Sequence, residues 1–329
     1  MSDFFGVDIS LGSVSACEET VSEAVAAPVA EARKYVEAAP VAHVDETGYR
    51  QVVQAERRRD LTFGQAVEAD EAPPPDKVPA KSKAWLWVAV TTYVTTFLVH
   101  ARRSTAAAKE LLGSFAGILV SDRWGAYRFI DAARRQLCWA HLLRDFEWIN
   151  EFGAKALGKA LVEDTKLMFR WWHELKEGGL ARSGFRAGRV IARRWSDASR
   201  RERMTPLMER VEALLEEGTA CGHKKTAGRC RKVLELRAAL WTFVRVEGVE
   251  PTNNAAERAL RPAVIWRKLS FGSASERGSR FAERMLTVTA TCPQQGRDVL
   301  EYLTAACEAD ARGEPAPSLL PAAALSAAA

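Results

Sequence analysis

In the stretch "HVDETGYR" (residues 43–50), the carboxylate of Asp45 directly follows a short apolar segment, residues 41–44. This segment predicts a short strand over 41–45, and Thr47-Gly48 predicts a turn directly after it. An acid at the end of a strand is typical of a ligand site at the edge of a sheet, although Asp45 could equally cap the turn. A second and a third acid in suitable positions would favour the ligand site.

The second acid follows another apolar stretch, "GILVSDRWGAYR" (residues 117–128), which predicts a strand over 117–122 ending on Asp122. Two strands are predicted between these acids, over 85–91 and 94–100, followed by a helix that begins at Ser104 or Thr105. A fifth short strand passes into the helix of "RRQLCWAHLLRDFEWINEFG". Three adjacent strands followed by alternation with helices predict an α/β fold with a mixed five-stranded sheet and flanking helices.

The third acid is Glu257, in the segment "TNNAAERALRPAVIWRKLS". A loop ending at Asn253-Asn254 precedes a helix that carries Glu257, and Pro262 predicts that this helix is short. Two strand-end carboxylates repel one another unless a cation lies between them, and Mg²⁺ prefers carboxylate oxygens. Glu257 could complete such a site. Each acid also has a structural reading, since Asp122 could cap the turn after it and Asn254-x-x-Glu257 matches a capping box.

Composition permits a nucleic-acid partner without requiring one. The 329 residues suffice for two domains or for one domain with a large insertion, and the net charge is +5. Six scattered cysteines indicate reduced thiols rather than a secreted disulfide scaffold. The first residues lack the pattern of a signal peptide, and the longest apolar run, residues 85–99, is too short to span a bilayer. We therefore expect a cytoplasmic protein.

Four segments together resemble the transposase of the insertion-sequence-66 family: "HVDETGYR", "GILVSDRWGAYR", "LCWAHLLRDF" and "TNNAAERALRPAVIWRKLSFGSASERGSRFAERMLT". The resemblance covers about residues 5 to 307. This family belongs to the DDE transposases, whose catalytic domain has a ribonuclease-H-like fold. The resemblance implies that Asp45, Asp122 and Glu257 are the first, second and third catalytic acids. It also implies that these acids bind Mg²⁺ or Mn²⁺, as two ions.

The resemblance implies DNA cleavage and strand transfer at transposon ends. Cys138-Trp139-Ala140-His141 matches a C-x-x-H element of several DDE groups. His141 either approaches the site or is a buried histidine that fixes the start of a helix, while packing is the favoured role of Cys138. The basic residues near Glu257 are expected to contact the DNA backbone: Arg258, Arg261, Arg267 and Lys268. The expected partners are transposon-end and target DNA, further copies of the chain on DNA and accessory proteins of the same element, with no membrane. The protein would be nucleoid-associated when bound to DNA.

Composition and hydrophobic periodicity, together with the resemblance, predict a domain organisation. Residues 1–40 are expected to be helical and the remnant of a DNA-binding region. Residues 41–153 form the first part of the catalytic domain, with a Pro-rich loop at 54–83, and residues 154–245 form an all-helical insertion. Residues 246–308, which carry Glu257, complete the catalytic domain, and residues 309–329 form a disordered tail.

Two other functions stay open at this stage. A shortened copy could be a non-catalytic DNA-binding remnant that modulates an intact transposase. Alternatively, a ribonuclease-H-like nuclease would cut DNA without joining it. Metal-dependent nicking separates the first alternative from a transposase, and strand transfer from pre-cut ends separates the second.

Overall fold

The computed structural model describes residues 10–52, 81–176, 197–270, 272–273 and 275–321. Most of the predicted 54–83 loop therefore lies outside the described residues. The chain divides into two compact units. Unit 1 comprises residues 1–117 and 254–329, and unit 2 comprises residues 118–253.

Unit 1 contains an antiparallel sheet of three strands, β1 (Val41–Val52), β2 (Lys81–Val90) and β3 (Thr95–His100), with β2 in the middle. The prediction of two paired strands near 85–100 is confirmed. The prediction that the first strand ends at Asp45 is wrong. β1 continues to Val52, and its pairing with β2 places Asp45 opposite Val88 in the interior of the strand. The predicted turn at Thr47-Gly48 is absent, because these residues pair with β2 and Tyr49 is buried in the core.

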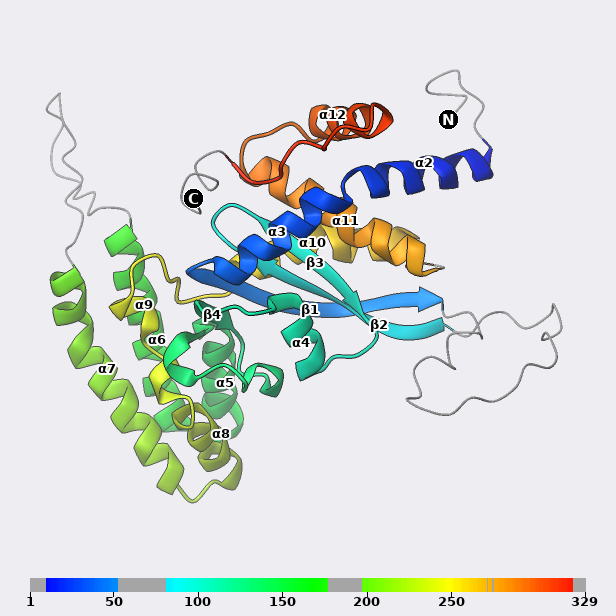
Figure 1. Cartoon of the computed structure of the whole chain (residues 1–329). Coiled ribbons are helices and arrows are strands. Elements are labelled where there is room, and N and C mark those ends of the chain that lie inside the picture. The colour runs from blue at the N-terminus through cyan, green and yellow to red at the C-terminus, as the bar shows by residue number, and fades with distance from the viewer. Residues whose placement is uncertain (1–9, 53–80, 177–196, 271, 274, 322–329) are drawn as a thin grey trace, which may run out of the picture. The chain divides into compact units, whose positions relative to one another are not determined.

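Four helices pack on this sheet (Figure 1): α3 (Ala26–Ala38), α4 (Thr105–Leu112), α10 (Asn254–Ser270) and α11 (Glu276–Gln294). Two more, α2 (Leu11–Ala24) and α12 (Val299–Ala311), pack on α11. The start of α4 is confirmed, since the Ala107 N–H donates to Oγ of Ser104. Gly113 ends the helix with φ +53° and lies against Glu37, which leaves no room for a Cβ atom. Residues 1–40 are predicted to be helical, and α2 and α3 confirm this for residues 11–24 and 26–38; both helices pack against α11.

α10 is longer than predicted, and the idea that Pro262 limits it is wrong. The helix continues eight residues past Pro262 to Ser270. Residues on both sides of the proline, Ala256, Leu260 and Ala263, are buried against β1 and β2 in one apolar cluster. This packing outweighs the local cost of an interior proline, which is about 3 kcal/mol. The helix begins at Asn254, so the cap position falls on Asn253 rather than on Asn254 as the capping-box reading requires.

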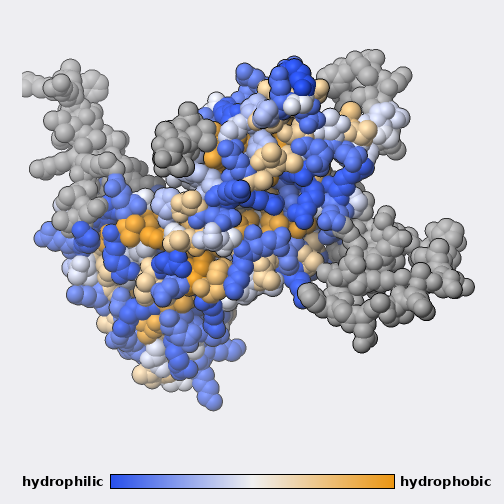
Figure 2. Space-filling view, viewed as in Figure 1, coloured by the Kyte–Doolittle hydropathy of each residue, from blue (hydrophilic) through white to orange (hydrophobic). Residues whose placement is uncertain are grey.

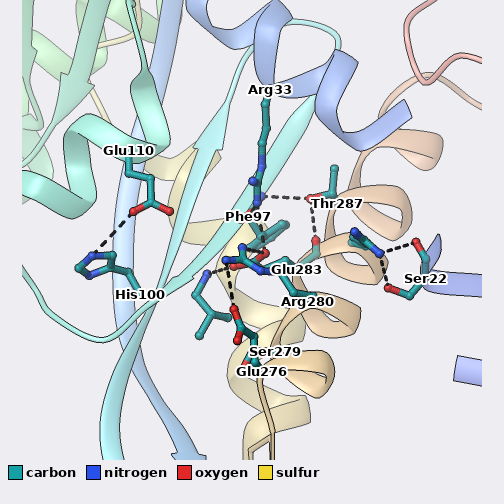
Figure 3. Close-up of polar contacts among 12 residues, drawn as sticks. Ser22, Arg33, Phe97, His100, Glu110, Glu276, Ser279, Arg280, Glu283 and Thr287 are labelled. Carbon is teal, nitrogen blue, oxygen red and sulfur yellow. Dashed lines mark hydrogen bonds and ion pairs between the residues drawn. The ribbon is translucent and has the colours of Figure 1, made fainter. Parts of the chain in front are cut away.

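α11 covers the outer edge of β3 with polar side chains (Figure 3). The backbone N–H groups of Val99, Phe97 and Thr95 donate to Glu283, Thr287 and Thr291, at 2.7, 3.1 and 3.1 Å. These acceptors recur every four residues along one face of α11, while the donors recur every two residues along β3. The edge groups that would pair with another strand are thereby hydrogen-bonded by a helix.

The prediction of a disordered tail from residue 309 is wrong for the described part of that segment. α12 extends to Ala311, and the chain beyond it packs back on unit 1. Leu319 is fully buried, and Tyr302 donates a hydrogen bond to the carbonyl of Pro317. Residues 322–329 lie outside the described residues. An apolar side chain within a Pro/Ala-rich segment is enough to anchor it.

Unit 2 begins with two parallel strands, β4 (Ile118–Ser121) and β5 (Arg135–Leu137). Its α-helices are α5 (Trp139–Phe152), α6 (Lys155–Lys176), α7 (Asp197–Ala220), α8 (Lys224–Leu234) and α9 (Thr242–Arg245). The long helices α6 and α7 pack together (Figure 1), and the rings of Trp139 and Trp241 are 4.5 Å apart in the core. The regular structure between 154 and 245 is helical wherever it is described, as expected. The strands β4 and β5 and the helix α5 nevertheless belong to the same compact unit as these helices.

The fold is mixed α/β with five strands in the described residues and both parallel and antiparallel pairs, as predicted. The ribonuclease-H-like assignment and the status of residues 154–245 as an insertion stay predictions. Hydrophilic side chains dominate the face seen in Figure 2, with smaller apolar patches between them. None of the described helices is long and apolar enough to cross a membrane.

Candidate active site

Asp45 and Glu257 lie on facing elements of unit 1. Asp45 shares the face of β1 that carries Tyr49, because side chains alternate along a strand. Val88, directly across from Asp45, belongs to the same buried cluster as Ala256, the neighbour of Glu257. Both acids are half-buried. They therefore belong to the interface between α10 and the sheet.

The level of Glu257 along β1 follows from a second contact. Near the end of α10, Arg267 donates to Oγ1 of Thr47 at 2.9 Å and also to the carbonyl of Gly48. Further along, the Ser273 N–H donates to the carbonyl of Arg50, so α10 runs in the same direction as β1. Ten helical residues rise about 15 Å, which equals about four to five strand residues. Glu257 therefore lies near the level of Ala42 to Val44, close to Asp45.

The basic residues of α10 separate into two groups. Arg258, Arg261 and Lys268 are exposed. They share the solvent face of the helix, opposite the face that packs on the sheet. Arg267 is half-buried, and its guanidinium bridges α10 to β1. The first three are thus available to a ligand, whereas Arg267 connects the two elements that carry the acids.

Asp122 and His141 follow the C-terminal ends of β4 and β5, the two parallel strands of unit 2. Ser121 pairs with Leu137 at the end of the ladder, so Asp122 and Cys138 are the next residues in register. The Cys138 N–H donates to the carbonyl of Ser121 at 2.9 Å. α5 begins at Trp139, and His141 lies in its first turn. The prediction that Asp122 follows the end of a strand is confirmed.

Asp122 also has the structural role that the sequence allowed. Its Oδ1 accepts a hydrogen bond from the Trp124 N–H at 2.8 Å, which fixes the turn into the 3₁₀ helix Gly125–Tyr127. This bond uses one of the about four hydrogen bonds that an ionised carboxylate can accept, so the Asp122 carboxylate can still bind a ligand.

Arg135 is a residue that the sequence reasoning missed. It is fully buried, and it donates to Oγ of Ser121 at 3.2 Å and to the carbonyl of Asp122 at 3.0 Å. Burial lowers the pKa of the Arg135 guanidinium, and the nearby Asp122 opposes that shift. A buried cation therefore supports the backbone that carries Asp122. The sequence contains no local signal for its burial, because Arg135 stands between Arg134 and Gln136 in a polar stretch.

Cys138 has a packing role. It is 1% exposed, and its sulfur accepts a hydrogen bond from the Asn253 N–H at 3.2 Å. The Trp139 N–H donates to the carbonyl of Pro251 at 2.8 Å. The start of α5 thus anchors the loop that precedes α10.

The sequence profile described as "Transposase IS66 family" matches residues 51–281. The chain belongs to the IS66 transposase family. Asp122, His141 and Glu257 fall inside the matched region, and Asp45 lies six residues before it.

A curated relative of this IS66-family chain is the "Uncharacterized protein y4qI" of Sinorhizobium fredii. The two are 29% identical over 275 residues, a region that covers 77% of this chain and 49% of the relative. The chain therefore spans about half the length of this curated relative. No solved structure matches the chain.

Proposed function

We propose that this chain is a DDE transposase that cleaves DNA at transposon ends and joins it to target DNA. Asp45, Asp122 and Glu257 are the proposed catalytic acids. The observation that carries the proposal is that α10, the helix of Glu257, packs on the face of β1 that bears Asp45, in a chain of a transposase family.

Asp122 is included because it directly follows the end of β4 and because it stands where the sequence resembles the second acid of the family motif.

The proposed acids suit a divalent metal. Asp45 and Glu257 supply hard carboxylate oxygens from one face of the sheet, which are the ligands that Mg²⁺ and Mn²⁺ prefer. Asp45, Asp122 and Glu257 would hold two such ions. When bound, these ions supply an activated water and stabilise the leaving oxygen of an in-line phosphoryl transfer.

The other residues position the substrate. Arg258, Arg261 and Lys268, on the exposed face of α10, would neutralise phosphates of the DNA backbone next to Glu257. Arg267 would keep α10 aligned with β1. His141, in the first turn of α5, would contact a phosphate or the scissile strand, and Arg135 would hold the backbone of Asp122. No covalent intermediate is needed, because a DNA 3′-hydroxyl is the second nucleophile.

The test uses purified protein and labelled DNA of the terminal repeats that flank the gene, with Mg²⁺ or Mn²⁺. We expect Asp45→Ala, Asp122→Ala and Glu257→Ala each to lower strand transfer at least about 1,000-fold while DNA binding is retained. Glu147→Ala is the matched control, because Glu147 is an exposed acid of α5. Full strand transfer by Asp122→Ala would refute the assignment.

The wild-type protein separates the alternatives in the same assay. Nicking without joining of pre-cut ends would identify a ribonuclease-H-like nuclease. Binding to terminal-repeat DNA without metal-dependent nicking would identify a DNA-binding remnant that modulates an intact transposase. Joining of pre-cut ends is the result that the proposal requires.

A further inference from the structure

The helix α8 is strongly basic. This helix has the sequence KKTAGRCRKVL and carries five basic residues and no acidic one within 11 residues. The net charge of the whole chain is +5, so positive and negative side chains balance over the rest of the chain. One face of α8 is buried in unit 2, while Lys224, Lys225, Arg231 and Lys232 are exposed. A helix this basic attracts a polyanion.

Four cationic side chains of unit 2 converge around one hollow of its surface. The hollow is lined by Arg123, Lys225, Gly228, Arg229 and Lys232. Gly228 has no neighbour within 4 Å of where a Cβ atom would be, so the hollow is open at this point. Arg123 and Arg229 both form ion pairs with Asp145, which is the acidic partner of the group. Four cations around a single carboxylate leave an excess of positive charge that fits a phosphate group.

A second hollow adjoins the first, because Lys225 lines both. Its walls are Trp148, Phe152, Gly222, His223, Lys224 and Lys225. Phe152 is 58% exposed, a large fraction for a phenylalanine. Trp148 lies between Phe152, at 5.9 Å between ring centroids, and the guanidinium of Arg229, at 4.1 Å from its own ring. An exposed aromatic surface with lysines beside it is typical of sites that stack nucleic-acid bases.

Both hollows are held in place by the packing of α8. His223 caps this helix, since its Nδ1 accepts a hydrogen bond from the Thr226 N–H at 3.2 Å. Thr226 in turn accepts one from the Ala154 N–H just after α5, at 3.3 Å. α5 and α8 therefore present the aromatic and the basic side chains from fixed backbones, as preorganised binding requires.

We infer that α8 and the end of α5 form a second DNA-binding site, distinct from the basic face of α10. The basic hollow binds a backbone phosphate, and the aromatic hollow stacks the adjoining unpaired base. Arg123 directly follows Asp122, so DNA in this site would pass next to the proposed catalytic acid. The inference rests on the proposed function only in taking DNA as the ligand, and it is tested by binding alone.

The first experiment measures the binding of fluorescent DNA by anisotropy over a range of salt concentrations, without divalent metal. The DNA is a duplex with a short single-stranded overhang. We expect Lys225→Ala/Lys232→Ala to reduce the slope of log affinity against log salt by about 0.7, which corresponds to one single-strand phosphate contact. Lys225→Arg/Lys232→Arg should keep the wild-type slope. Lys159→Ala/Lys166→Ala is the matched control, because both lysines are exposed on α6 of the same unit.

The second experiment tests base stacking. Phe152→Ala should weaken binding to the overhang duplex about tenfold and leave binding to a blunt duplex unchanged. Phe129→Ala, another exposed phenylalanine of unit 2, should change neither. Circular dichroism of each variant checks that it is folded.

The inference is overturned if Lys225→Ala/Lys232→Ala binds as the wild type does, or if Lys159→Ala/Lys166→Ala reduces the slope equally. If Phe152→Ala weakens binding to the overhang duplex and to the blunt duplex equally, base stacking is refuted. If the protein binds RNA of the same sequence more tightly than DNA, DNA is not the ligand of this site. Loss of strand transfer in the three acid variants decides the proposed function separately, because those variants should bind DNA normally.

Discussion

Glu283 is a carboxylate whose side chain is 2% exposed, and it has three partners. It accepts a hydrogen bond from the Val99 N–H at 2.7 Å and forms ion pairs with Arg33 and Arg280 at 3.3 and 2.8 Å (Figure 3). Both arginines are partly exposed, so the ion pairs remove little of their hydration. The Glu283 carboxylate is buried, so its charge is stabilised by these three partners in place of water.

We expect Glu283→Ala to lower the free energy of unfolding by about 1–3 kcal/mol, because it leaves the Val99 N–H without its acceptor, while the two arginines stay partly hydrated. Urea unfolding measures the change. Glu308→Ala is the control, since Glu308 is 63% exposed beside Arg312 and its removal should change stability by about 0.5 kcal/mol or less. Equal effects of the two substitutions would contradict this account of Glu283.

Sequence reasoning at this scale worked for residues fixed by local pattern. Asp122 follows a strand as predicted, because three apolar residues, Ile118 to Val120, and an acid just after them specify that position locally. Arg135 and Glu283 could not be predicted in the same way. A charged residue in a sequence indicates the surface, and these two are buried only because groups far along the chain satisfy them. Tertiary contacts of that kind leave no local signal.

At the scale of elements, α11 replaces the missing neighbour of β3 with a row of side chains. Thr291 both accepts from the Thr95 N–H and donates to the Thr95 carbonyl, at 3.1 and 3.0 Å. Thr287 accepts from the Phe97 N–H and donates to the Glu283 carbonyl. Because a threonine hydroxyl can donate and accept at once, it can bridge a helix and a strand edge.

The expected result for Thr291→Val is a loss of about 1–3 kcal/mol in the free energy of unfolding, since valine keeps the shape and leaves the Thr95 N–H unsatisfied. Thr287→Val should have a similar effect. Thr289→Val is the matched control, because Thr289 is exposed and its hydroxyl bonds only to carbonyls of its own helix. A chemical denaturation series gives the three values, and a loss for Thr289→Val as large as for Thr291→Val would refute the edge-capping role.

The lengths of β1 and α10 were underestimated from sequence for one reason. Thr47-Gly48 and Pro262 are local stop signals, and in this chain both are overridden by packing. Gly48 pairs opposite Trp85, and its carbonyl accepts from Arg267. Pro262 lies between Leu260 and Ala263, which are buried against the sheet. The existence of both elements was predictable, whereas their ends depend on partners that the sequence does not reveal.

At the scale of the whole molecule, burial of weak acids makes stability depend on alkaline pH. All six cysteines are free thiols, as the scattered positions predicted. Burial raises the pKa of the Cys230 thiol from 9.0 to about 11, and it also raises the pKa values of Cys292, Tyr49 and Tyr302. Cys230 belongs to unit 2 and the other three to unit 1, so both units contain such groups.

The sign of the effect follows from proton linkage. A thiol with a raised pKa holds its proton in the folded state at a pH where the unfolded chain has released it, so stability falls as pH rises. For Cys230 this contribution is complete below pH 9.0 and is lost between pH 9.0 and about 11. The two tyrosines add to the decline above pH 10.0, their ordinary value. The free energy of unfolding should therefore decrease steadily from about pH 9 upward.

Cys230→Ala isolates one part of that decline. The substitution lowers stability at every pH by leaving a cavity, so the informative quantity is the slope of unfolding free energy against pH between 9 and 11. We expect that slope to be shallower in Cys230→Ala than in the wild type and unchanged in Cys17→Ala, because Cys17 is exposed. Urea titrations at a series of pH values under reducing conditions measure it. An unchanged slope in Cys230→Ala would mean that the thiol titrates alike in the folded and unfolded chains. That result would contradict the burial of Cys230, a residue of α8, against Gly218 of α7.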